Sequence, residues 1–254
     1  MSSDSTVIFV YVHPGDGVVG EAFHASMVDN AGRLDPKRFM GVFSTSSPSP
    51  MLSRNNAIGM VLALDPRPDW ILWWDTDMAL PYDAVTRLID SAEEHDAKVA
   101  TCFGLMQQFG HREGQEWTPM PNAYYRFDET VDDFYITDQM QSTTEPFWCD
   151  ATGFGFTLIR PSVYDNYPEE HLPFHKRLDE GLGQDIRFFH HAGEKVLYCP
   201  QIRSMHVRTM GLDFPLWMAA NGWTDEAQGA LGHKPRPGID FTLSDPAAGK
   251  VSHK

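Results

Sequence analysis

The chain has 254 residues and a formal net charge of −15 at pH 7, a length that suits one large α/β domain or two small ones. With 42% hydrophobic residues it can bury a sizeable core. The acidic balance argues against a broad basic face that grips nucleic acid through its phosphates, although a local groove is compatible with it.

The cysteines and the terminal segment indicate a reducing compartment. The three cysteines are odd in number and widely spaced, which gives neither a disulfide framework nor a zinc pattern. The N-terminus lacks the basic and apolar regions of a signal peptide, and no run approaches the ~20 apolar residues of a membrane span. We therefore expect a soluble, cytoplasmic protein without a membrane span.

Strand-like and helix-like segments alternate over the first hundred residues. The apolar, β-branched run 7–12 predicts a buried first strand. The elements expected after it are a helix over 20–30, a strand over 39–43, a Ser/Pro-rich loop over 44–50, a helix over 54–64 capped by Ser53, a strand over 70–74, a helix from Pro81 to about residue 95, and a strand over 98–105. This alternation predicts an α/β fold with a mostly parallel sheet flanked by helices.

The alternation stops at 107–146, a segment rich in aromatic, acidic and proline residues that predicts an irregular or hairpin-forming insertion. It resumes with a strand expected over 154–159, helices over 161–167 and 183–192, and a last short strand over 195–199. We expect one domain over 1–215, followed by a partly flexible C-terminal extension over 216–254.

The apolar run 70–74 ends directly in two carboxylates, Asp75 and Asp77. In a continuing strand these side chains share one face, roughly 7 Å apart. Two carboxylates at the end of a core strand repel one another unless a cation lies between them. Ligands of parallel sheets bind at the carboxyl ends of strands, so the pair predicts a divalent-metal site. The alternative is a solvated strand end or a cap of the next helix.

Four pieces of sequence, in one order, extend this interpretation. They are 53–57 (SRNNA), 70–77 (WILWWDTD), 150–160 (DATGFGFTLIR) and 183–188 (GQDIRF), the last followed by 195–198 (KVLY) and His206. Over roughly residues 7–206 they resemble the GT-A glycosyltransferases, especially the family-2-like and polypeptide GalNAc-transferase-like branches. The resemblance implies a Rossmann-like GT-A fold and an enzyme of the hexosyltransferase type. Such an enzyme moves a sugar from a nucleotide-diphosphate donor to a hydroxyl acceptor.

The resemblance also implies a set of metal ligands. Asp77 would bind the ion, Asp75 would bind it directly or through water, and His206 would be the third protein ligand. Oxygen ligands suit Mn²⁺ or Mg²⁺, and an imidazole nitrogen shifts the preference towards Mn²⁺. The ion would stabilise the charge that develops on the diphosphate leaving group. Otherwise His206 is an ordinary surface or core histidine.

Asp185 matches the acidic residue that acts as general base in inverting members of the family, taking the proton of the acceptor hydroxyl. The family usually has Glu-Asp at this point, whereas this chain has Gln184-Asp185. The alternative is an exposed aspartate at a helix start, favoured by the helix dipole. A histidine metal ligand is frequent in retaining relatives, so the stereochemistry is open, with inversion as our working interpretation.

Arg54 and Asn55 resemble the Arg-Asn pair that opens a helix near the nucleotide and phosphates of the donor. An arginine there can bind a diphosphate oxygen, or it can be solvated. Gly153, in the Gly-Phe-Gly piece with Gly155, would let the backbone approach the sugar or acceptor closely, or it marks a bulge.

The loop after the second strand departs from the family pattern. Many relatives carry an acidic residue there that reads the base, whereas this chain has 44–47 (STSS). A UDP-sugar is therefore the default donor only. Tyr11 and His13, at the end of the first strand, are candidates for contact with the base.

Two other functions stay open. A nucleotidyltransferase on a related fold typically begins with a Gly-rich loop and a basic residue, which 13–17 (HPGDG) does not provide. A non-catalytic sugar- or metal-binding module would use the aromatic insertion as its surface. Acceptor contacts are expected in 107–146 and around Trp217 and Trp223. The acceptor itself could be a glycan, a small molecule or, less in keeping with the acidic charge, a modified nucleic acid.

Overall fold

The computed structural model describes residues 4–13, 20–46, 49–108, 118–128, 133–136, 142, 144–168, 172–174, 184–207 and 211–212. The predictions made for Gly183, for parts of the insertion 107–146, and for the extension 216–254 with Trp217 and Trp223 lie outside these residues. The division into a domain over 1–215 and an extension therefore stays a prediction.

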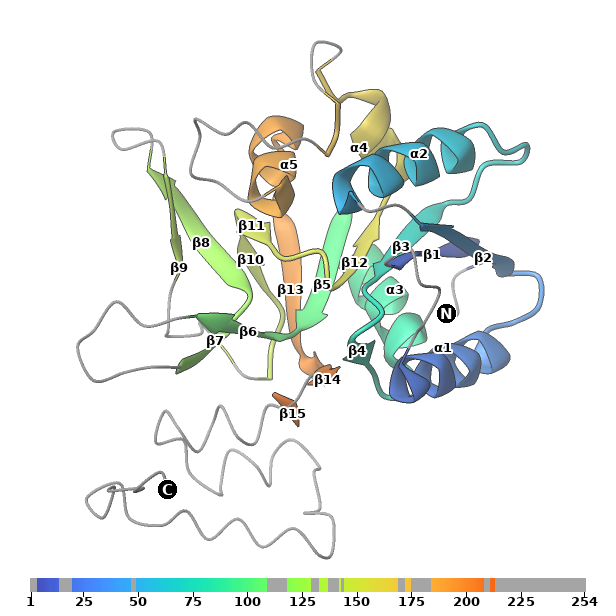
Figure 1. The fold of residues 1–254 in the computed structure, drawn as a ribbon, viewed down its shortest axis with the longest axis horizontal. Coiled ribbons are helices and arrows are strands. Elements are labelled where there is room, and N and C mark those ends of the chain that lie inside the picture. The colour runs from blue at the N-terminus through green and yellow to red at the C-terminus, as the bar shows by residue number, and fades with distance from the viewer. Residues whose placement is uncertain are drawn as a thin grey trace, which may run out of the picture.

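A seven-stranded sheet with the order β10-β13-β5-β12-β3-β1-β2 forms the centre of the fold (Figure 1). Its strands are β1 Val7–His13, β2 Phe39–Ser46, β3 Trp70–Trp74, β5 Val99–Phe103, β10 Phe147–Cys149, β12 Phe156–Ile159 and β13 Val196–Arg203. The pairs β1–β2, β1–β3 and β5–β13 are parallel. Strand β12 runs antiparallel to both β3 and β5, and β10 runs antiparallel to β13. The predicted α/β class with a mostly parallel sheet is confirmed.

Helices cover both faces of this sheet, and each face has its own hydrophobic cluster. The helices are α1 Glu21–Arg33, α2 Pro50–Leu62, α3 Ala84–Glu94, α4 Pro161–Asp165 and α5 Gln184–Ala192. Residues of α1 and α3 belong to one cluster, and residues of α2, α4 and α5 to the other. Since successive strand residues point to opposite faces, β3 contributes to both clusters. None of the described helices has the length and apolar character needed to cross a bilayer.

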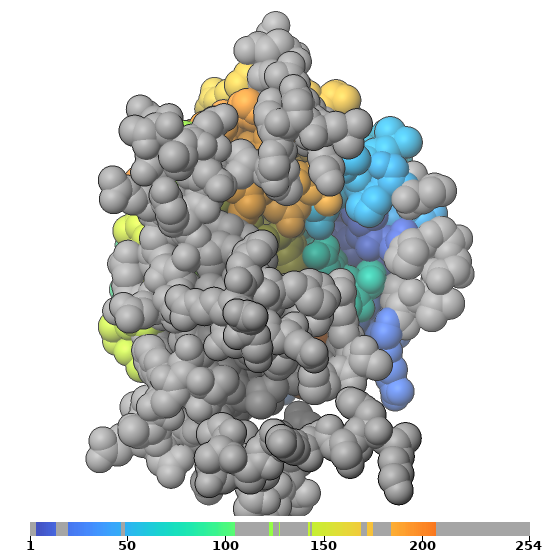
Figure 2. Space-filling view, turned by 60° about the vertical axis from the view of Figure 1, so that its left-hand side comes forward, coloured from blue at the N-terminus to red at the C-terminus, as the bar shows by residue number. Residues whose placement is uncertain are grey.

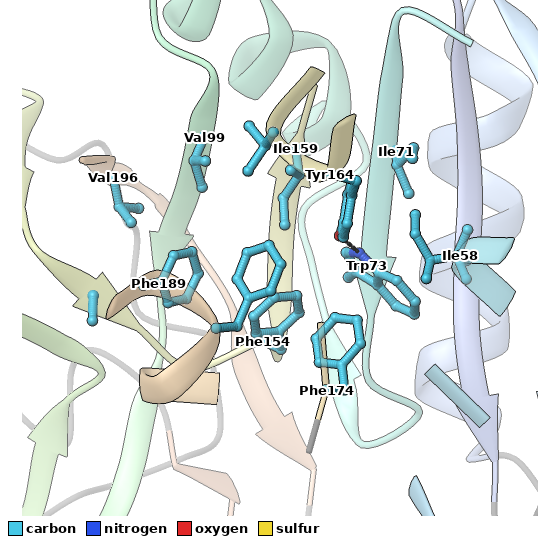
Figure 3. Packing of buried hydrophobic residues seen from close by; sticks show 14 of the residues in the cluster. Ile58, Ile71, Trp73, Val99, Phe154, Ile159, Tyr164, Phe174, Phe189 and Val196 are labelled. Atoms are coloured by element: carbon cyan, nitrogen blue, oxygen red, sulfur yellow. Dashed lines mark hydrogen bonds between the residues drawn. The ribbon is translucent and has the colours of Figure 1, made fainter. Parts of the chain in front are cut away.

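Strand β3 is buried along its whole length, as its run of apolar residues predicts. The indole N–H of Trp73 donates to the hydroxyl of Tyr164 over 2.7 Å, inside the cluster that Figure 3 shows. The rings of Phe154 and Phe174 pack edge-on against Trp73. The carboxyl end of the strand is thus held firmly where the candidate site begins.

Helix α2 begins earlier than predicted. Ser49, not Ser53, is the N-cap, and its hydroxyl accepts from the Leu52 N–H at 3.4 Å. Pro50 takes the first helical position, where its missing N–H costs nothing. Ser53 is consequently buried in the first turn. The predicted loop over 44–50 is shorter, because β2 extends to Ser46.

Helix α3 begins later than predicted, after Asp83 at its N-cap. Pro81 lies in the preceding turn, where its carbonyl accepts from the Ala84 N–H and from the side chain of Asn30. The strand expected over 98–105 is divided at Gly104 into β5 and the separate strand β6 Leu105–Gln108.

The described part of the insertion forms hairpins, one of the two structures predicted for it. Strand β6 pairs with β7 Thr118–Pro121, and β8 Ala123–Asp128 pairs with β9 Asp133–Ile136 and with β11 Ala151–Thr152. The predicted last strand is longer than 195–199, since β13 reaches Arg203. Strand β14 Met205–Val207 follows it, between β4 Met78–Ala79 and β15 Gly211–Leu212.

Replacing Tyr164 by Phe removes the acceptor of the buried Trp73 indole N–H. We expect Tyr164→Phe to lower the free energy of unfolding by about 1–3 kcal/mol, because an unsatisfied buried donor keeps its full desolvation cost. Urea denaturation followed by tryptophan fluorescence measures the change. Tyr82→Phe, at an exposed tyrosine, is the matched control and should change it by less than about 0.5 kcal/mol. Equal losses in both variants would contradict the prediction.

Candidate active site

The predicted site residues come from distant parts of the chain and meet beyond the carboxyl end of β3. Arg54 comes from α2, Asp75 and Asp77 follow β3, Asp185 lies in the first turn of α5, and His206 lies in β14. Figure 2 shows the atoms of α2 (light blue), of the segment after β3 (teal) and of α5 (orange) next to one another on one face.

Asp75 and Asp77 do not share a strand face. Strand β3 ends at Trp74, and residues 75–77 form a turn closed by a 3.0 Å hydrogen bond from the Met78 N–H to the Asp75 carbonyl. The Asp75 N–H donates to the Gly155 carbonyl at 2.8 Å. Because the chain turns here, the period-two argument for the pair is wrong, and the two carboxylates have different partners.

Asp77 pairs with His206. The Nε2 atom of His206 lies 2.8 Å from the Asp77 Oδ2 atom, and both side chains are partly buried. The antiparallel pairing of β14 with β4 places His206 opposite Met78, the residue after Asp77. The structure thus brings together two of the three predicted metal ligands.

Asp75 turns instead to Arg54, which also binds Asp185. The Nη2 atom of Arg54 lies 3.1 Å from Asp75 Oδ1, and its Nη1 atom lies 2.6 Å from Asp185 Oδ1. Arg54 is only 5% exposed, and the rings of Phe154 and Phe174 lie 5.3 and 5.7 Å from its guanidinium carbon. Of the two predicted alternatives for Arg54, a solvated side chain is wrong, and a contact with the donor phosphates stays a prediction.

The charges around Arg54, Asp75 and Asp185 are unbalanced. Burial alone would lower the pKa of Arg54, but the carboxylates of Asp185 and Asp75 outweigh it, so that pKa is raised and the guanidinium stays charged. Burial raises the pKa of Asp75, and the neighbouring Asp185 and Asp77 add to the rise, which Arg54 opposes. Arg54 therefore faces two carboxylates, and Asp77 lies near enough to Asp75 to add negative charge, which a second cation would relieve.

Asp185 is a partly exposed carboxylate with two fixed partners. Its side chain is 29% exposed, its Oδ1 atom binds Arg54, and its Oδ2 atom accepts from the Phe154 N–H at 3.2 Å. Each carboxylate oxygen can accept two hydrogen bonds, so each has a further acceptor site. The geometry leaves Asp185 able to accept a proton from a bound hydroxyl.

Asn55 and Gly153, predicted to bind the donor, make internal contacts. The Asn55 amide donates to the Phe174 carbonyl, and its Oδ1 atom accepts from the Phe174 N–H at 3.0 Å. The Gly153 N–H donates to the Asn122 carbonyl, and the Gly153 carbonyl accepts from the Thr157 hydroxyl at 3.1 Å. Their role in donor binding stays a prediction.

Tyr11 and His13 lie at the carboxyl end of β1, the neighbour of β3. They pair in register with Ser44 and Ser46 of β2. The Tyr11 ring also packs edge-on against Phe23 of α1. They are therefore at the same edge of the sheet as Asp75, as predicted.

The Asp77–His206 pair presents one carboxylate oxygen and one imidazole nitrogen, donor types that divalent ions take as ligands. Two ligand atoms at roughly 2.1 Å from one ion, at right angles, lie about 3 Å apart, close to the observed Nε2–Oδ2 distance. Among the residues that the structure describes, no three His, Cys, Asp or Glu side chains are arranged to hold a metal. Two protein ligands suit Mg²⁺ or Mn²⁺, because such ions commonly keep water and substrate phosphate oxygens as their other ligands.

Asn122 is a structural residue of the site that sequence reasoning missed. Its Oδ1 atom accepts from the Gly104 N–H at 3.2 Å and from the Tyr198 hydroxyl at 2.8 Å, and its carbonyl accepts from the hydroxyl of Thr152. A Cβ atom at Gly104 would lie 3.3 Å from the Asn122 side-chain nitrogen, which explains the glycine. No local pattern marks Asn122, since its partners come from three separate strands and turns.

Sequence comparison identifies no relative: no family model and no curated protein matches this chain. Solved structures do share its fold. One is A197 from STIV, with a TM-score of 0.57 at 14% identity over 82% of this chain and 90% of that chain. Another is GalNAc-T7 with UDP, GalNAc and Mn²⁺, with a TM-score of 0.53 at 12% identity over 81% of this chain and 44% of that chain. The chain thus matches less than half of GalNAc-T7, and at these identities the likeness shows a GT-A-like fold alone.

Proposed function

We propose that the protein is a metal-dependent glycosyltransferase, which moves a sugar from a nucleotide-diphosphate sugar to a hydroxyl acceptor. One observation carries the proposal: an Asp77–His206 pair and an Arg54–Asp75–Asp185 network meet at the carboxyl end of β3. This is the edge at which open α/β sheets bind their ligands. The fold likeness to GalNAc-T7, whose structure contains UDP, GalNAc and Mn²⁺, supports the same chemistry.

Asp77 and His206 would hold the metal, with Asp75 beside them, and the mixed oxygen and nitrogen ligands favour Mn²⁺ over Mg²⁺. The bound ion would supply the positive charge that stabilises a departing nucleoside diphosphate. UDP is our default nucleotide, and Tyr11 and His13, at the carboxyl end of β1, are our candidates for contact with its base.

Asp185 would act as general base in an inverting transfer. The acceptor hydroxyl gives its proton to the Asp185 carboxylate while its oxygen bonds to the anomeric carbon of the donor sugar. The bond from that carbon to the diphosphate oxygen breaks, and the nucleoside diphosphate leaves with the electron pair. The partial exposure of Asp185 and its free acceptor capacity support this role.

Removing either predicted ligand should weaken metal-dependent donor binding. In thermal-shift titrations with UDP, we expect Mn²⁺ to stabilise the native protein, and we expect Asp77→Asn and His206→Ala to weaken the apparent Mn²⁺ affinity by about tenfold or more. Asp90→Asn and His95→Ala, both on the exposed surface at α3, are the matched controls.

An unchanged Mn²⁺ titration in His206→Ala would show that His206 is not a metal ligand. If no nucleoside diphosphate stabilises the wild-type protein with any divalent metal, the glycosyltransferase proposal itself fails.

Replacing Asp185 by Asn should separate binding from turnover. We expect Asp185→Asn to lower kcat by about 10²–10⁴-fold, the usual contribution of a general base, while Mn²⁺–UDP binding persists. Donor-sugar turnover and thermal shift measure the two effects. Asp165→Asn, in an exposed ion pair with Arg67, is the control. Full turnover by Asp185→Asn would contradict the assignment, and binding without any wild-type turnover would favour a non-catalytic module.

A further inference from the structure

We infer that Arg54 is a positioning residue, which orients the Asp185 carboxylate and ties it to the turn that carries Asp75 and Asp77. The inference rests on the proposed glycosyltransferase function. It departs from the resemblance, which places this arginine against the phosphates of the donor.

The first support is the geometry of the guanidinium. Its two terminal nitrogens lie 2.6 Å from Asp185 and 3.1 Å from Asp75, two residues that belong to different elements. Because the guanidinium is planar and rigid, its two ion pairs fix the position of one carboxylate relative to the other. The ammonium group of a lysine presents no such fork.

The second support is the enclosure of Arg54. With 5% exposure, and with the rings of Phe154 and Phe174 beside it, the side chain is held among protein groups. Asn55, the next residue, binds both backbone groups of Phe174. Both side chains of the Arg-Asn pair therefore contact protein groups: Asn55 fixes the backbone of Phe174, and the Phe174 ring packs beside Arg54.

The third support is the way in which Asp185 is held. Arg54 and the Phe154 N–H each bind a different oxygen of this carboxylate, which fixes the plane of the group. The other end of the network, Asp75, is two residues from the metal-ligand candidate Asp77. Arg54 thus connects the general base to the donor end of the site.

Kinetics and binding of Arg54→Lys distinguish positioning from phosphate binding. We expect kcat to fall by about a hundredfold, as for other small misplacements of a catalytic group, with the Kd of Mn²⁺–UDP unchanged. The double variant with Asp185→Asn should be no slower than Asp185→Asn alone, because both changes disable the same general base. Arg67→Lys, in the exposed ion pair with Asp165, is the matched control. A weaker Kd with kcat unchanged would overturn the inference and restore the phosphate contact.

Hydrogen exchange tests the inference without turnover. In the ligand-free protein, Arg54→Lys should speed exchange of the Phe154 amide, which donates to Asp185, by about tenfold or more, while amides of β3 keep their protection. Unchanged exchange at Phe154 would show that Arg54 does not hold Asp185. Hydrogen exchange gives a result even if no donor is turned over. A failure of the proposed function can therefore be told apart from a failure of the positioning role of Arg54.

Phe174→Leu is the second variant, because it keeps every charge and loosens the packing beside the guanidinium and against Trp73. It should lower kcat and speed Phe154 exchange in the same direction as Arg54→Lys, by a smaller factor. If Arg54→Lys does not fold, an unchanged kcat and unchanged exchange in Phe174→Leu would overturn the inference.

Discussion

A single buried guanidinium joins the parts of the candidate site. An arginine with 5% exposure would be very costly without partners, and Arg54 has two carboxylates from segments that are distant in the sequence. Helix α2, the turn after β3 and the start of α5 must therefore meet. If both carboxylates were removed, the buried guanidinium would be left uncompensated, which is the costly case for a buried ion pair.

The strands beside this network determine where it can form. Strand β3 packs through alternate residues into both hydrophobic clusters, so its carboxyl end is fixed within the sheet. Its antiparallel neighbour β12 begins just after Gly155 and Phe154, whose backbone groups bind Asp75 and Asp185. The segment that leads into this antiparallel strand thus holds the main chain of Asp75 through the Gly155 carbonyl and the carboxylate of Asp185 through the Phe154 N–H.

Much of the fold could be predicted because its signals are local. An apolar run predicted β3, and strand–helix alternation predicted the sheet. Element boundaries were less predictable: the predicted cap Ser53 lies inside the first turn of α2, and Ser49, before Pro50, is the N-cap. The prediction that Asp75 and Asp77 share a strand face was wrong because the strand ends at Trp74 and the chain turns over residues 75–77, where the Met78 N–H donates to the Asp75 carbonyl.

By itself, the sequence determined the α/β class, the buried strand that leads into Asp75 and Asp77, and the placement of Asp185 in the first turn of a helix. These follow from hydrophobic periodicity and from residue preferences at element ends. Only the tertiary structure decided that Asp77 pairs with His206 and that Arg54 faces inward. Those partners are 129 and 131 residues apart, and contacts at such separations depend on strand order and helix packing, which no local pattern contains.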